Sequence, residues 1–108
     1  PVKTITDLDS PYTLTEQDST VLVNASAGDV LVVLPPAASA VGRVYIIKRI
    51  DESLSSNVTI AGNDYSTTGL EIVDTNSIFS PVDPTNSFVL QSAGDVGEGG
   101  LWAIIASH

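Results

Sequence analysis

The segment Val30-Leu31-Val32-Val33-Leu34 is apolar at every position, and Val44-Tyr45-Ile46-Ile47 and Leu101-Trp102-Ala103-Ile104-Ile105-Ala106 share that property. A strand of a small antiparallel sheet normally alternates, with one side chain toward the core and the next toward water. A run that is apolar on both faces needs a second covering layer, and 108 residues leave little chain to supply one. The three runs therefore predict a β-rich domain that buries a second face against identical copies of itself.

Turn residues separate the β-forming runs at intervals of about eight to twelve residues, which is typical of a sandwich or barrel. The turn at 25–29, with Gly28 at positive φ, predicts a hairpin between the runs 20–24 and 30–34. The expected fold class is all-β, an antiparallel sandwich or jelly-roll-like barrel of about eight strands. Strands are expected over residues 12–15, 20–24, 30–34, 43–50, 57–60, 70–73, 77–79, 87–91 and 101–106. The run 87–91 is expected to pair with the run 101–106 across a loop over residues 92–100.

The length fits one domain, which we place at residues 12–108. Residues 1–11 are expected to be a linker or entry segment from a longer protein. The run 44–50 places Val44, Ile46 and Lys48 on one face, and its charged end, with Lys48 and Arg49, is expected to emerge into solvent. The predicted contacts between copies are made by Val30, Val32, Tyr45, Ile47, Trp102 and Ile104.

Charge limits the possible partners. The net charge of −9, from 13 acidic and 4 basic residues, repels nucleic-acid phosphates and anionic membrane surfaces. No apolar run approaches the ~20 residues of a membrane-spanning helix. We therefore expect no nucleic-acid partner and no membrane insertion. The absence of Cys excludes disulfides and thiolate metal sites.

Catalytic and metal chemistry have little support in the sequence. The only histidine is the terminal His108, so a serine nucleophile would have no positioned base, and the chain has no cysteine to act as one. The acidic pairs Asp7/Asp9 and Asp51/Glu52 do not form the twelve-residue loop of a calcium site. We expect no enzyme activity, no catalytic residues, no metal site and no cofactor. A glycosidase needs only two suitably spaced carboxylates, so a polysaccharide-degrading domain stays open as an alternative.

Carbohydrate binding is the expected ligand chemistry. Sugar sites on β folds combine an aromatic ring with amide and carboxylate side chains on loops. Asn63, Asp64 and Tyr65 offer that combination in a predicted turn. Trp102 and Tyr45 lie within predicted strands and are expected in the core or in the contact between copies.

The order of motifs along the chain resembles a β-rich module of bacteriophage tail fibres and related virion proteins. The resemblance extends from Tyr12 to Ile105, whereas the stretch 65–84 follows no such pattern. It is carried by Tyr12-Thr13-Leu14-Thr15, Asp18-Ser19-Thr20-Val21-Leu22-Val23, Val32-Val33-Leu34-Pro35-Pro36-Ala37, Gly42-Arg43-Val44-Tyr45-Ile46-Ile47-Lys48, Asn57-Val58-Thr59-Ile60 and Leu101-Trp102-Ala103-Ile104-Ile105.

The resemblance implies a tip or near-tip domain of a fibre, assembled as a homotrimer in an extracellular virion and facing the host cell. The expected function is non-enzymatic attachment to a host surface glycan or protein, with avidity from several weak sites. Two alternatives stay open within fibres, a purely structural trimerisation module and a polysaccharide-degrading tailspike-type domain. A monomeric binding module from a cellular surface protein is the third alternative.

Overall fold

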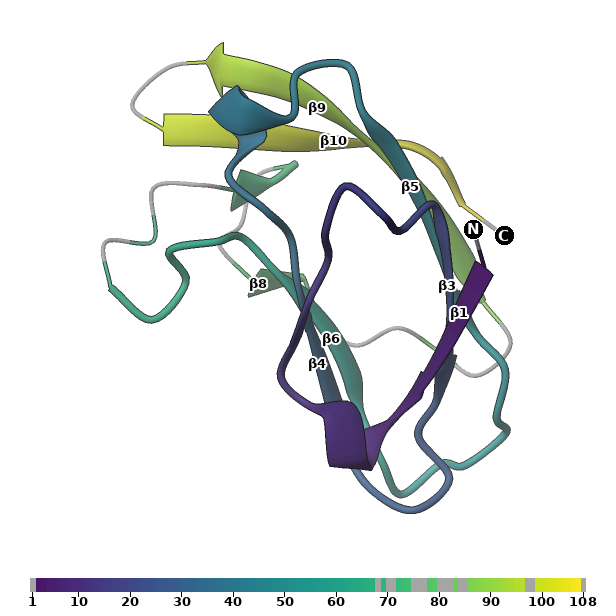
Figure 1. The fold of residues 1–108 in the computed structure, drawn as a ribbon. Coiled ribbons are helices and arrows are strands. Elements are labelled where there is room, and N and C mark those ends of the chain that lie inside the picture. The colour runs from purple at the N-terminus through teal and green to yellow at the C-terminus, as the bar shows by residue number, and fades with distance from the viewer. Residues whose placement is uncertain are drawn as a thin grey trace.

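Figure 1 shows the computed structural model of the chain, which describes residues 2–67, 69, 72–74, 78, 79, 83, 86–96 and 99–107. Ten strands and two single-turn 3-10 helices make up its regular structure. In chain order they are β1 (Val2–Thr6), η1 (Asp7–Asp9), β2 (Tyr12–Thr13), β3 (Thr20–Asn24), β4 (Val30–Val33), η2 (Ala37–Ser39), β5 (Val44–Arg49), β6 (Val58–Ala61), β7 (Ile72–Val73), β8 (Ile78–Phe79), β9 (Ser87–Val96) and β10 (Gly99–Ser107).

The strands form two layers (Figure 1), a six-stranded sheet with the order β1-β3-β5-β9-β10-β7 and a four-stranded sheet with the order β2-β4-β6-β8. From β1 to β6 the chain enters the two sheets in turn. Each strand from β3 to β6 pairs in parallel with the strand two places earlier in the chain. This half of the molecule therefore winds as a short parallel solenoid, in which every coil adds one strand to each sheet.

The predicted antiparallel sandwich or jelly roll is wrong, because the chain turns at corners between layers where hairpins were expected. β3 and β4 belong to different sheets, and residues 25–29 carry the chain from one to the other. Gly28 is not among the positive-φ glycines of the described chain. A Cβ built on it would lie 3.1 Å from Asp7 Oδ2. A small residue fits here because the corner after β3 packs against the corner after β1.

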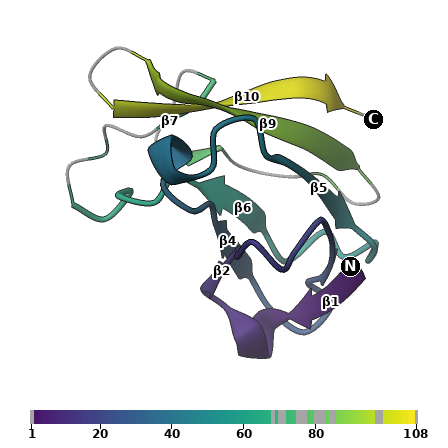
Figure 2. The same cartoon turned by 45° about the horizontal axis from the view of Figure 1, so that its top comes forward.

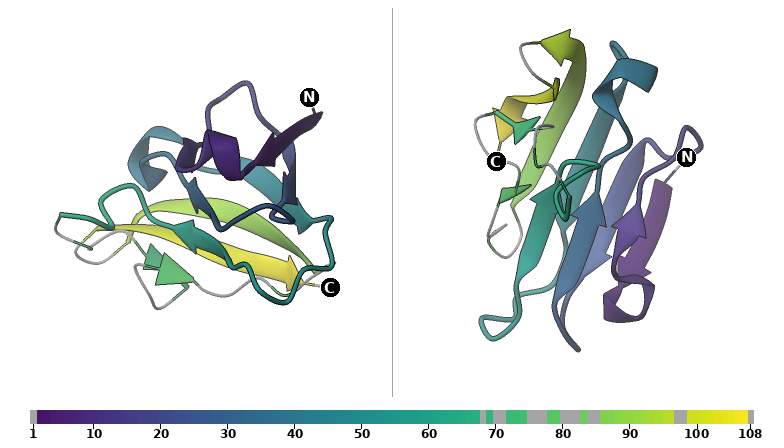
Figure 3. Two further views of the ribbon diagram at one scale, coloured as in Figure 1. Left: turned by 90° about the horizontal axis from the view of Figure 1, so that it is seen from below. Right: turned by 90° about the vertical axis from the view of Figure 1, so that its left-hand side faces the viewer.

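The last third of the fold reverses direction. β9 runs antiparallel to both β5 and β10, which confirms the predicted pairing of 87–91 with 101–106. The loop expected over 92–100 is shorter than predicted, because β9 continues to Val96 and β10 begins at Gly99. The short strands β7 and β8 pair with β10 and β6. Figure 3 shows the chain termini on opposite sides of the stacked strands.

The N-terminal segment belongs to the same folded unit as the rest. Val2–Thr6, which lie within the expected linker, form the edge strand β1 in parallel with β3. Ile5 is fully buried in the common core. The strand ends where Thr6 caps η1, with the Asp9 carboxylate accepting a hydrogen bond from the Thr6 backbone N–H at 2.9 Å.

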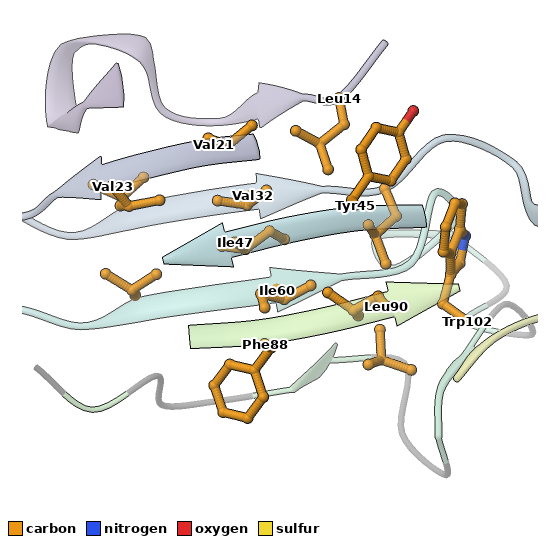
Figure 4. Close-up of a cluster of buried hydrophobic side chains, with 14 of the residues drawn as sticks. Leu14, Val21, Val23, Val32, Tyr45, Ile47, Ile60, Phe88, Leu90 and Trp102 are labelled. Carbon is orange, nitrogen blue, oxygen red and sulfur yellow. The ribbon is translucent and has the colours of Figure 1, made fainter. Parts of the chain in front are cut away.

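The core fills the space between the layers with aliphatic side chains and the aromatic rings of Tyr45, Phe88 and Trp102 (Figure 4). The rings of Tyr45 and Trp102 lie 5.5 Å apart between centroids and are tilted by 40°. Trp102 Nε1 donates to the carbonyl of Pro35 at 3.0 Å, and Ser92 Oγ donates to that of Ala37 at 2.7 Å. These bonds fasten the turn that contains η2 to the β9–β10 hairpin (Figure 2).

Candidate interaction surfaces

The predicted ligand residues Asn63, Asp64 and Tyr65 lie together in the turn that follows β6. The Asp64 carbonyl accepts from Thr67 N at 3.0 Å and from Gly69 N at 2.9 Å, so the backbone is organised by its own hydrogen bonds. Asn63 is exposed, and Asp64 and Tyr65 are half-buried. The turn extends away from the two sheets (Figure 1, left). It carries an amide, a carboxylate and a phenol side chain next to one another, and no pocket lies among the described residues.

Five of the six residues expected between copies lie inside the single chain. Val30, Val32, Tyr45, Ile47 and Trp102 are each at most 1% exposed, and Ile104 is partly buried against the same cluster. In this fold their side chains are occupied by the space between the two sheets, which leaves them no surface for a partner. Any contact through these strands must use the alternate positions.

The alternate positions form a largely aliphatic outer face on the six-stranded sheet. Strand register aligns one row across five strands, with Val2 opposite Thr20, Thr20 opposite Ile46, Ile46 opposite Val89 and Val89 opposite Ala106. We call this row, together with its two neighbouring rows, the outer face. The neighbouring rows are Val44, Gln91 and Ala103 on one side and Thr4, Leu22, Lys48 and Ser87 on the other.

The outer face is partly exposed and almost free of charge. Val44 is 40% exposed, Ile46 38% and, beside the rows at a bulge of β10, Ile105 54%. Lys48 is the single charged residue in the three rows. The sequence did not distinguish this face from the core, because Val44 and Ile46 share their side of β5 with Lys48 and Tyr45 and Ile47 share the other side with Arg49.

A buried ion pair joins two corners of the solenoid. Arg49 is 2% exposed, which corrects the expectation that it emerges into solvent. Its Nε and one terminal nitrogen each lie 3.0 Å from an Asp51 carboxylate oxygen. The same nitrogen donates to the carbonyls of Ser53 and Ser56, and Asp51 Oδ1 accepts from Ala25 N at 2.9 Å. Hydrogen bonds from Arg49 outweigh burial and lower the pKa of Asp51 from 3.8 to about 2.

A second polar cluster connects β2 with the start of β5. The Asp18 carboxylate accepts from the Tyr12 hydroxyl at 2.9 Å and from Thr15 N at 3.0 Å, and the Tyr45 hydroxyl donates to the Thr15 carbonyl at 2.8 Å. Burial and the hydrogen bond to Asp18 raise the pKa of Tyr12 to about 12. The phenol therefore stays protonated at neutral pH, and the cluster closes the corner after β2.

One carboxylate of each acidic pair considered for metal binding is engaged by neighbouring groups. Asp9 accepts a hydrogen bond from the Thr6 backbone N–H at the start of η1, and Asp51 is held by Arg49. Within the described residues no three His, Cys, Asp or Glu side chains gather in a way that could hold a metal ion. Among the same residues, no helix has the length and apolar character needed to cross a membrane. The terminal His108 lies outside the described residues.

Comparison of the chain with models of protein families, with curated proteins and with solved structures finds no match. The fold and its surfaces therefore have to be interpreted from their own geometry.

Proposed function

We propose that the chain is a non-enzymatic module of tail-fibre type, which associates with copies of itself and contributes to attachment to a host cell. The observation that carries the attachment part is the turn after β6. Its backbone is organised by hydrogen bonds to the Asp64 carbonyl, and it places Asn63 in solvent beside Asp64 and Tyr65. A preorganised turn loses little conformational entropy when it binds a polar ligand.

A stiff scaffold suits this role. The turn begins one residue after β6, which is the third strand of a parallel ladder, so its base is tied to the solenoid. A single exposed turn without a pocket binds a ligand weakly, because few groups converge on the ligand. Two or three copies held together would raise the overall affinity by effective concentration without a new contact.

The test is binding to an array of oligosaccharides from bacterial capsules and lipopolysaccharides, with the chain in its associated state. Asn63→Ala is expected to weaken binding about tenfold, the equivalent of about 1.4 kcal/mol. Gln17→Ala is the matched control, because Gln17 is also an exposed amide side chain in a turn. Equal binding by the two variants, or no binding to any glycan by the unaltered chain, would overturn the assignment of this turn.

The outer face favours a second candidate, a purely structural module that holds fibre subunits together. That role predicts association without any glycan or host-protein binding. The polysaccharide-degrading alternative predicts release of reducing ends when the chain is incubated with a polysaccharide it binds.

A further inference from the structure

We propose that the outer face of the six-stranded sheet is the surface through which copies of this chain meet. The proposal rests on the self-association in the proposed function and assigns it to particular residues. It also moves the contact from the buried side chains named by the sequence pattern to the opposite side of the same strands. The central row of Val2, Thr20, Ile46, Val89 and Ala106 would lie at the middle of the contact.

The aliphatic side chains of the outer face form a continuous surface across several strands. Four of the five side chains in the central row are aliphatic, and Leu22, Val44 and Ala103 extend the surface in the neighbouring rows. Single exposed aliphatic residues are ordinary, whereas a contiguous patch across several strands marks an interaction site. Sheets pack face to face through this kind of surface at about 10 Å separation.

The distribution of charge favours a second copy of the chain as the partner that covers the outer face. Two molecules that each carry a net charge of −9 repel one another unless their carboxylates stay out of the contact. β1, β3, β5 and β10 contain no Asp or Glu, and none of the residues in the three rows is acidic. Two outer faces can therefore meet without bringing carboxylates together, whereas a basic partner would be drawn to the acidic corners.

The area of the outer face sets the expected affinity between two copies. Five strands about 4.8 Å apart and about 20 Å long give a flat area on the order of 450 Å². Stable complexes bury about 800 Å² on each partner, so the face falls at the small end of specific interfaces. We expect reversible association of the isolated chain, with a dissociation constant in the micromolar range.

The experiment is sedimentation equilibrium over a concentration series from about 1 to 500 μM, a range that brackets a micromolar constant. The unaltered chain is expected to exceed its 11.2 kDa monomer mass as concentration rises. Ile46→Glu places a carboxylate in the central row and is expected to weaken association at least tenfold. Leu54→Glu is the matched control, since Leu54 is 92% exposed in the corner after β5 and belongs to none of the three rows.

A second variant guards against misfolding. Val89→Glu makes the same change on β9, and the circular dichroism and unfolding midpoint of both variants are compared with those of the unaltered chain. Loss of association in both folded variants, with association kept in Leu54→Glu, supports the outer face. Association that survives both changes overturns the face and leaves the proposed self-association in place. A chain that stays monomeric throughout overturns both.

Discussion

At the residue scale, the side chains that hold the corners together decide the stability of the solenoid. Arg49 is the last residue of β5, and Asp51 lies in the loop that follows it. Asp51 also accepts a hydrogen bond from Ala25 N, which ties this loop to the corner after β3. A buried ion pair of this kind adds little relative to a well-packed apolar pair, but removing one partner leaves an uncompensated charge. The pair therefore matters most when it is broken.

Asp51→Asn is expected to lower the free energy of unfolding by about 3–5 kcal/mol, because it leaves the Arg49 charge buried without its counter-ion. Urea denaturation at pH 7 measures the change. Glu52→Gln removes a neighbouring exposed carboxylate and is expected to change stability by less than about 0.5 kcal/mol. Similar losses in the two variants would show that the ion pair has no special role.

The same carboxylate gives the stability a pH dependence. The folded-state pKa of Asp51, about 2, lies below its ordinary value of 3.8, so its contribution is complete above about pH 5 and is lost as the pH falls through 3.8 toward 2. A pKa lowered by this amount corresponds to roughly 2–3 kcal/mol. Urea denaturation between pH 5 and pH 2 should show this loss in the unaltered chain and a smaller loss in Asp51→Asn.

At the element scale, β9 depends on one strained position. Gly94 lies within the strand at φ 78°, where the ladder between β9 and β10 shifts its register. A Cβ on Gly94 would come within 3.0 Å of Val41 Cγ2, in the turn that contains η2. Glycine therefore allows both the bend of the hairpin and its close approach to that turn.

Gly94→Ala is expected to destabilise the protein by about 1–2 kcal/mol through its backbone angle, and by more through the contact with Val41. Gly42→Ala is the matched control, since Gly42 has a φ of 82° but open space around its Cβ position. Thermal unfolding should show a larger loss for Gly94→Ala. Addition of Val41→Ala should recover the difference, and failure to recover it would exclude the steric cause.

At the scale of the whole molecule, the distribution of charge and apolar surface controls association. The acids are concentrated in corners and loops, and the three rows of the outer face combine aliphatic side chains with Thr4, Thr20, Ser87 and Gln91 and one charged residue, Lys48. Repulsion between copies is therefore long-ranged and screened by salt, whereas the attraction between faces is short-ranged and apolar.

Association of the chain is accordingly expected to strengthen severalfold when the ionic strength rises from about 0.02 to 0.3 M, because the Debye length falls below about 10 Å. Sedimentation at the two salt concentrations measures this effect. Weaker association at high salt would point to a contact made by charge pairs, which the outer face does not provide.

Local sequence patterns were sufficient to predict where most strands lie and which of their residues share one side of a strand. The predicted run 20–24 matches β3, and the runs 30–34, 43–50 and 57–60 match β4, β5 and β6 within one or two residues. These features follow from local properties, namely β-branched residues, period-two alternation and turn residues. The Asn63–Tyr65 turn was likewise predicted locally, while its role as a ligand site stays a prediction.

Strand pairing, and the side of the six-stranded sheet that is exposed to solvent, became known only from the folded chain. A short turn with glycine serves equally as a hairpin or as a corner between sheets, so residues 25–29 could not reveal that β3 pairs with β5 instead of β4. Burial of Arg49 likewise requires acceptors from Asp51, Ser53 and Ser56 that only the folded corner brings together. Pairing and burial are properties of residues distant in sequence, which local patterns do not specify.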